Sequence, residues 1–155
     1  MNARTDVDAP VAGCPLCEAD GGLLVFRNSH LRIIQANSAS EAGFPAFYRV
    51  VWMRHVAEFS DLSTAERETC MNAVLAVEQI LRSELQPTKI NLAALGNVVP
   101  HLHWHVIARF DWDSHFPAPV WSGPQRAPDL AKLAAVASRC AGINRLIAEK
   151  MASLC

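Results

Sequence analysis

Three histidines alternate with apolar residues in the segment 101–107, and this pattern constrains the fold of the chain more than any other feature. The segment reads His-Leu-His-Trp-His-Val-Ile, with histidines at positions 101, 103 and 105. Residues two apart in a β-strand project from the same face, so the pattern predicts a strand with imidazoles on one face and Leu102, Trp104 and Val106 on the other. The apolar face is suited to packing on a core. The histidine face collects groups that exchange protons or bind metal near neutral pH.

Three explanations fit the row of histidines. It could be the polar face of a half-exposed strand, although Thr, Lys or Glu would serve such a face equally well. It could be a metal site, since neutral imidazole is a common zinc ligand. It could also carry phosphoryl or nucleotidyl transfer, with one imidazole as nucleophile and its neighbours binding phosphate and protonating the leaving group. Gly96 and Asn97 favour this third reading, because they form a turn signal that leads into the strand and supply an amide that can donate to a phosphate oxygen.

The segment 101–107 resembles the signature of the histidine triad (HIT) family, His-φ-His-φ-His-φ-φ, in which φ is apolar. Asn91 and the segment 96–99 are similar to the family's Asn and Gly-Gln approach to the triad, with Asn97 where many members carry Gln. The segment 48–56 resembles the family's apolar strand that ends in a basic residue and His-Val. The similarity covers roughly Cys14 to Arg126, which is most of the chain.

The resemblance implies a role for each histidine of the triad. His103 would attack the α-phosphate of a bound nucleotide and form a nucleotidyl-histidine intermediate. His105 would contact the phosphate and protonate the departing group, after which water would release a nucleoside monophosphate. His101 would orient the site, or hold zinc in the zinc-bearing variant of the family. No catalytic cofactor is required for this chemistry.

Three asparagines are candidates for substrate binding. Asn97 is expected to donate to a phosphate oxygen, and its contribution would be electrostatic. Asn91 is a candidate for shaping the phosphate pocket, with bonding to the local backbone as the alternative. Asn37 lies near where many members place an Asp for the ribose hydroxyls, so this departure leaves sugar recognition less well defined, and a turn residue is the alternative there.

Cys14 and Cys17 form a Cys-x-x-Cys pair, which alone is consistent with half of a zinc site, a redox pair or two free thiols. No strand is expected before the pair, which disfavours a redox motif of the thioredoxin type. Some HIT proteins bind a structural zinc through an N-terminal Cys pair, the His after the apolar strand and the first triad His. Matched by motif, these residues are Cys14, Cys17, His55 and His101, so the resemblance implies a structural zinc with these four ligands.

The rest of the chain predicts an α+β fold. Ser63 and Glu66 form a capping-box pattern that opens a long helix ending at Pro87, and a second helix is expected to start near Pro128, with Gly142 as a possible point of interruption. The expected strands cover residues 23–26, 31–34, 47–52, 90–95 and 101–110. The resemblance implies that about five antiparallel strands and the two helices combine as in HIT proteins, which usually pair as homodimers through a continuous sheet. We expect a mobile N-terminal tail over 1–13 and a single HIT domain over 14–155 that includes the C-terminal helix.

Charge and hydropathy exclude several classes of protein. The formal net charge is −1 and the basic residues are scattered, which argues against a nucleic-acid-binding surface. No run of 18 to 20 apolar residues suggests a membrane helix, and the acidic N-terminus does not have the pattern of a secretory signal. Five cysteines without an export signal indicate the reducing cytoplasm.

The function that these observations favour is enzymatic. The chain is interpreted as a nucleotide hydrolase or nucleotidyl transferase that cleaves at the α-phosphate of dinucleoside polyphosphates or nucleoside phosphoramidates through a covalent nucleotidyl-histidine. Two alternatives stay open: a nucleotide-binding interaction protein with little turnover, and a zinc-dependent hydrolase that uses the triad as metal ligands.

Overall fold

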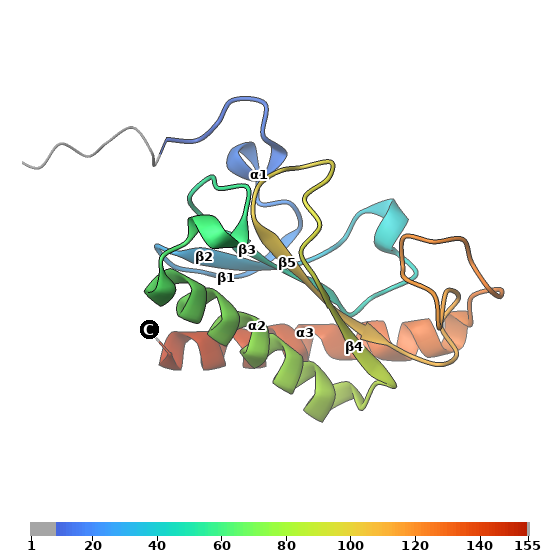
Figure 1. The fold of residues 1–155 in the computed structure, drawn as a ribbon. Coiled ribbons are helices and arrows are strands. Elements are labelled where there is room, and N and C mark those ends of the chain that lie inside the picture. Colours follow the sequence, from blue (N-terminus) through green and yellow to red (C-terminus); the bar gives the residue numbers. More distant parts are fainter. Residues whose placement is uncertain (1–8, 155) are drawn as a thin grey trace, which may run out of the picture.

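Five antiparallel strands form one sheet in the order β1-β2-β3-β5-β4 (Figure 1). The structure is a computed structural model and describes residues 9–154. The strands are β1 (Leu23–Arg27), β2 (Leu31–Gln35), β3 (Phe47–Trp52), β4 (Lys89–Ala93) and β5 (His103–Arg109). The expectation of an α+β fold with about five antiparallel strands is therefore confirmed. The expected strand over 90–95 lies one residue earlier and is shorter than predicted.

The hairpin between β1 and β2 forms where the sequence predicts it. The side-chain oxygen of Asn28 accepts hydrogen bonds from the backbone N–H groups of His30 and Leu31, both at 2.9 Å. An Asn side chain that bonds its own backbone two or three residues further on is typical of a tight turn. The turn therefore fixes the register of the first two strands, and β2 in turn pairs with β3.

Helix α2 (Thr64–Leu85) begins and ends at the signals that the sequence carries. Ser63 and Glu66 form the capping box, in which the Ser63 hydroxyl accepts from the Glu66 N–H and the Glu66 carboxylate accepts from the Ser63 N–H. Gln86 has a φ of 47° and ends the helix in the left-handed conformation, immediately before Pro87. Cys70, Val74, Val77 and Leu81 are buried on one stripe, as their spacing predicts.

Helix α3 (Leu130–Ser153) is continuous, so an interruption at Gly142 does not occur. Cys140, Ile143 and Ile147 flank the glycine and are buried. A glycine inside a helix costs about 1 kcal/mol relative to alanine, which the burial of these apolar neighbours outweighs. The one-turn helix α1 (Pro15–Glu18) and the short 3-10 turns η2 (Ala39–Glu41) and η3 (Phe59–Asp61) are not predicted by the sequence.

The two faces of the sheet differ (Figure 1). Helices α2 and α3 cover one face, where Tyr48, Val50 and Val106 belong to the main hydrophobic core. The opposite face carries α1 and the histidines of β5. The expected tail over 1–13 lies mainly outside the described residues, and the boundary at residue 14 stays a prediction. No helix within residues 9–154 has the length and apolarity needed to cross a membrane.

Candidate functional site

Strand β5 carries two of the three histidines, because it begins at His103 and not at His101 as the sequence predicts. The backbone N–H of His101 donates to the Val99 carbonyl at 2.8 Å, so a tight turn centred on Pro100 precedes the strand. The Leu102 N–H donates to the Val56 carbonyl at 2.7 Å. His101 therefore lies outside the paired strand β5, and its ring has different contacts from those of His103 and His105.

His103 lies on the face of the sheet opposite α2 and α3, and its tautomer is fixed by the backbone. Its Nδ1–H donates to the carbonyl oxygen of His101 at 2.6 Å. Since a neutral imidazole carries one proton, Nε2 is left with a free lone pair. Burial lowers the pKa of His103, and the nearby charge of Arg49 lowers it further. His103 is therefore held as a neutral imidazole with one unprotonated nitrogen.

His105 follows on the same face, with its ring centroid 4.8 Å from that of His103 and the two planes at 80°. Burial lowers the pKa of His105 to about 3, and the charges of His103 and Arg49 act in the same direction. Its Nδ1 is buried and has no hydrogen-bond partner among the described residues. Buried polar atoms are nearly always satisfied, so an orphan at such a position favours a ligand or water as the missing partner.

Two further side chains border the triad. Arg49 of β3 lies opposite His105 in the sheet register, forms an ion pair with Glu41 and lies 5.1 Å from the Phe47 ring centroid. Trp121 comes from the loop over 110–129, and its ring centroid is 5.0 Å from that of His105. Sequence reasoning did not select either residue. Arg49 could have been found from strand alternation, because Phe47, Arg49 and Val51 share a face. The sequence indicates only that Trp121 lies in the Pro-rich segment after the triad strand, where a tryptophan could close over a base or anchor the loop on the sheet.

The three asparagines are placed differently from one another. Asn97 is exposed in the loop between β4 and β5, after Gly96, whose φ is 70°. Asn37 is exposed just after β2. Asn91 lies in β4 opposite Ile107, and its Oδ1 accepts from Nη1 of Arg109 at 2.8 Å. Their roles in substrate binding stay predictions, and Asn91 has a structural partner already.

Cys14, Cys17, His55 and His101 converge although they lie on different elements. Their ligand atoms all lie within 4.8 Å of one another. The cysteines cap and occupy α1, His55 follows β3, and His101 precedes β5. The cluster can therefore hold a metal ion, with two thiols and two imidazoles.

Three sulfur–nitrogen distances in the cluster match those of a tetrahedral site. Nδ1 of His101 is 3.5 Å from Sγ of both cysteines, and Nδ1 of His55 is 3.4 Å from Sγ of Cys17. A tetrahedral zinc with bonds of about 2.3 Å to sulfur and 2.0–2.1 Å to nitrogen places S and N about 3.5 Å apart. Nε2–H of His101 donates to the Trp52 carbonyl at 2.6 Å, which leaves Nδ1 free to bind metal. Burial lowers the pKa of His101, which favours the neutral ring that a ligand requires.

Arg32 of β2 fixes α1 in place beneath the cluster. This residue is only 3% exposed, and its guanidinium donates to the carbonyl of Leu16 at 2.7 Å and to those of Ala19 and Asp20 at 3.1 Å. Leu16 lies within the one-turn helix α1, and Ala19 and Asp20 follow its end; all three are among the carbonyls that a short helix leaves unsatisfied. Arg32 thus positions the Cys-x-x-Cys turn on the sheet.

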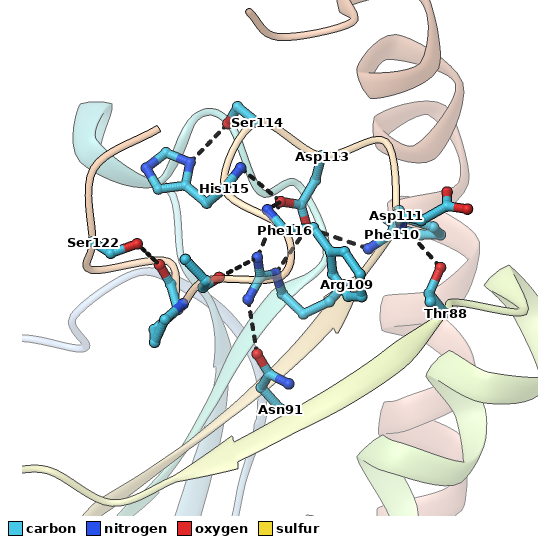
Figure 2. A network of polar contacts seen from close by, with 12 residues as sticks. Thr88, Asn91, Arg109, Phe110, Asp111, Asp113, Ser114, His115, Phe116 and Ser122 are labelled. Atoms are coloured by element: carbon cyan, nitrogen blue, oxygen red, sulfur yellow. Dashed lines mark hydrogen bonds and ion pairs between the residues drawn. The ribbon is translucent and has the colours of Figure 1, made fainter. Parts of the chain in front are cut away.

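A second polar network lies at the far end of β5 (Figure 2). Arg109 is 1% exposed and donates from Nε and Nη2 to the two oxygens of Asp113, at 2.8 and 3.0 Å. Nη2 also donates to the Ala118 carbonyl at 2.8 Å. The Asp113 carboxylate accepts from the N–H groups of Phe110, His115 and Phe116 as well. This network anchors the start of the loop that carries Trp121.

Comparison with known proteins identifies relatives of the whole domain. The HIT domain family matches residues 22–112. A histidine triad protein from Bradyrhizobium japonicum is 27% identical, with a TM-score of 0.64, over 83% of this chain and 92% of that one. A histidine triad (HIT) protein from Sinorhizobium meliloti is 26% identical, with a TM-score of 0.61, over 79% and 90% of the two chains.

A third structure extends the likeness of the fold. A histidine triad protein from Marinobacter aquaeolei shares 22% identity with this chain and a TM-score of 0.63, over 83% of this chain and 93% of the other. No curated protein matches the sequence.

Proposed function

Because the chain belongs to the histidine triad family, we propose that it is a nucleotide hydrolase or nucleotidyl transferase that cleaves at the α-phosphate. Its substrates are dinucleoside polyphosphates or nucleoside phosphoramidates. The observation that carries the proposal is the bond from Nδ1–H of His103 to the His101 carbonyl, since it leaves Nε2 of His103 unprotonated on the face of the sheet opposite α2 and α3.

The reaction proceeds in two displacements. The Nε2 lone pair of His103 attacks the α-phosphorus, the bond from phosphorus to the leaving oxygen or nitrogen breaks, and His105 gives a proton to that atom. Water then attacks the phosphorus, His105 accepts its proton, and the phosphorus–nitrogen bond breaks. A nucleoside monophosphate leaves and His103 is regenerated. A phosphate acceptor in place of water makes the same intermediate a transferase step.

The protonation of His105 is tied to substrate binding. Burial holds its pKa near 3 in the ligand-free site, so the ring is neutral there. An anionic phosphate beside the ring favours its charged form and raises that pKa, which supplies the acid when the substrate is present. Asn97 donates to a phosphate oxygen as negative charge grows, Asn91 shapes the far side of the pocket and Asn37 meets the ribose.

Zinc is proposed at Cys14, Cys17, His55 and His101. Four protein ligands close the coordination sphere, which is the property of a structural site and not of a catalytic one. When bound, the ion stabilises the fold around α1 and the start of β5. His103 and His105 are outside the cluster, which disfavours a hydrolase that uses the triad as its metal ligands. The metal matters to catalysis only through His101, whose carbonyl oxygen fixes the His103 tautomer.

We also propose a homodimer in the cytoplasm. β4 pairs with β5 on one side only, and Leu92 and Leu95 at this edge are 41% and 50% exposed. A free edge with apolar side chains favours pairing with a second copy. The free cysteines Cys14, Cys17, Cys70 and Cys140 suit a reducing compartment.

The test is to trap the intermediate. Wild type, His103→Ala and the exposed control His30→Ala are incubated with a diadenosine polyphosphate and with an AMP phosphoramidate. The reactions are quenched, and the mass of each protein is measured by mass spectrometry. We expect an AMP adduct on wild type and His30→Ala, and none on His103→Ala, whose turnover falls by at least about 10⁴-fold. Full turnover by His103→Ala refutes the assignment. Saturable AMP binding by wild type with no adduct and no product favours a nucleotide-binding interaction protein.

A further inference from the structure

Trp121 lies against the triad although it is remote from it in sequence. Its ring centroid is 5.0 Å from that of His105, with the planes at 68°, and 6.4 Å from that of Phe47. The residue is 51% exposed, so the part of the ring that does not touch His105 and Phe47 is open. An exposed Trp beside a buried histidine is a large apolar surface with no partner from the described chain on its open side.

The surroundings of Trp121 are suited to a planar aromatic group. We use the name aromatic corner for Phe47, Arg49, His105 and Trp121. The Arg49 guanidinium lies over the Phe47 ring at 5.1 Å, and the Phe47 ring meets the His105 ring edge-on at 5.5 Å. Aromatic rings and a guanidinium attract the π-face of a further ring by stacking and by cation–π contact. Stacking of this kind accepts any nucleobase, because every base has a π-face.

The position of Trp121 is fixed by its loop. Arg109 donates to the Ala118 carbonyl at 2.8 Å, three residues before Trp121. Just after Trp121, Ser122 closes a turn, with its N–H 3.0 Å and its hydroxyl 2.7 Å from the Pro119 carbonyl. The loop is also joined to itself through the Gln125 N–H, which donates to the Ser114 carbonyl at 2.6 Å. Trp121 is therefore preorganised beside the triad, which reduces the ordering that binding would require.

We infer that Trp121 is a specificity-determining residue that stacks on a planar aromatic ring of the substrate next to the nucleophile. The inference rests on the proposed function and deepens it, since it names the feature of the substrate that the site recognises. The ring is the base of the nucleotide that is transferred, or a planar ring in the leaving group. Arg109 and Asp113 do not touch the substrate and act by positioning Trp121.

Three substrates separate the sources of the ring. The unsubstituted phosphoramidate of AMP has its base as the only aromatic ring, ribose 5-phosphoramidate has none, and the ribose compound with an aromatic amine has a ring only in the leaving group. The variants are Trp121→Ala and Trp121→Phe. The matched control is Trp112→Ala, from the same loop, because Trp112 stacks on Phe110 at 4.8 Å and meets Lys132 of α3.

We expect Trp121→Ala to raise KM about 10-fold for the AMP compound, to leave the ringless compound within 2-fold of wild type, and to keep kcat close to wild type. Trp121→Phe restores most of the loss, and Trp112→Ala behaves as wild type. A loss confined to the compound with the aromatic amine also supports the inference and places the contact at the leaving group. An equal loss on all three substrates, or no loss on any, overturns it, since a merely structural role does not depend on the presence of a ring.

Calorimetry with AMP alone separates this inference from the proposed function. If wild type turns over substrate, and Trp121→Ala matches wild type both in AMP affinity and in KM for all three substrates, the role of Trp121 is overturned and the proposed function stays intact. Wild type that neither binds AMP nor reacts overturns both. We expect the Kd of AMP to rise about 10-fold in Trp121→Ala if the ring is the base, with Trp112→Ala unchanged.

Discussion

The two ends of β5 are held by different chemistry. At its start, His101 joins two thiols and a second imidazole in a cluster that can hold a metal ion. At its end, Arg109 and Asp113 form a buried ion pair with a full set of backbone partners. The catalytic candidates His103 and His105 lie between these ends. The cluster and the ion pair are the two supports of this short strand.

The comparison shows that the two ends of one strand are held by two independent sets of side chains. The cluster would be completed by an ion from outside the chain, whereas Arg109 and Asp113 neutralise each other. The cluster includes His101, whose carbonyl oxygen accepts from Nδ1–H of His103 and so sets the tautomer of that ring. The ion pair fixes the loop that brings Trp121 to His105. The first interaction therefore bears on His103, the proposed nucleophile, and the second on the position of Trp121 beside His105.

Removal of the metal should give the largest effect. Chelation of the zinc-loaded protein is expected to lower the free energy of unfolding by about 4 kcal/mol when free zinc had exceeded its Kd 1,000-fold. Hydrogen exchange should rise around α1 and His101 and stay unchanged in α3 and in the loop after Arg109. Chemical denaturation with and without chelator measures the difference.

The cysteines provide a matched control for chelation. Cys17→Ser should abolish the response to chelator, whereas Cys140→Ser, on the buried side of α3, should retain it. A denaturation midpoint that is the same with and without chelator, in protein shown to contain one zinc, would be incompatible with a structural role of the ion.

Asp113→Asn should give the next largest effect, at the other end of the strand. The substitution leaves the Arg109 guanidinium buried without its counter-charge, and breaking a buried pair costs about 3 kcal/mol or more. Exchange should rise in the loop after β5 and not around the metal cluster. Denaturation of the variant and of the double variant Arg109→Met/Asp113→Asn measures the change; the double variant should recover part of the loss, because no charge is then buried alone and the amide oxygen at position 113 still accepts from the loop N–H groups.

The pH dependence of stability checks the same pair. Burial alone would raise the pKa of Asp113, but hydrogen bonds from Arg109 and from the N–H groups of His115 and Phe110 outweigh it, and the pKa lies below its usual value. A carboxyl with a depressed pKa contributes stability above the pKa of the unfolded chain, and this contribution is lost as the pH falls through the folded value. Wild type should therefore lose more stability on acidification than Asp113→Asn. An identical acid dependence of the two proteins would contradict the pair's role.

The two ends also differ in how far the sequence predicts them. The strands, the caps of α2 and the start of α3 follow from alternation, the Ser63 capping box and Pro128, because these signals are local. The cluster of cysteines and histidines was found through the resemblance to the HIT family, since spacing in sequence does not show that Cys14 and His101 meet.

The Arg109–Asp113 pair could not be chosen from sequence alone. Alternation from His103 places Arg109 on the triad face, and a buried arginine there demands a partner. Two acidic residues follow at 111 and 113. The turn after Phe110 determines which of them forms the ion pair with the guanidinium. The separation of His101 from the strand depends likewise on the turn around Pro100, which strand periodicity does not register.

Arg32→Lys should give a moderate effect at the metal end. Lysine keeps the charge but lacks the planar guanidinium whose Nε and Nη2 reach the carbonyls of Leu16, Ala19 and Asp20 from two different nitrogens, so α1 is held less firmly. We expect zinc affinity to fall on the order of 10-fold, as for other residues that support metal ligands from behind. Competition with a chromophoric chelator measures the Kd. Arg27→Lys, on the neighbouring strand, is the control. Equal zinc affinities in the two variants would show that Arg32 does not support the metal site.

Asp20→Asn should give the smallest effect, and it tests whether burial explains the difference between the ion pairs. Asp20 pairs with Arg27 near the metal end, but both side chains are 42% exposed, whereas those of Arg109 and Asp113 are 1% and 3% exposed. An exposed pair contributes about 0.2–1 kcal/mol and is screened by salt. The substitution keeps the Asp20 carbonyl that Arg32 uses, so zinc affinity should not change. Denaturation at low and high salt measures the effect, and a loss as large as that of Asp113→Asn would show that burial does not separate the two pairs.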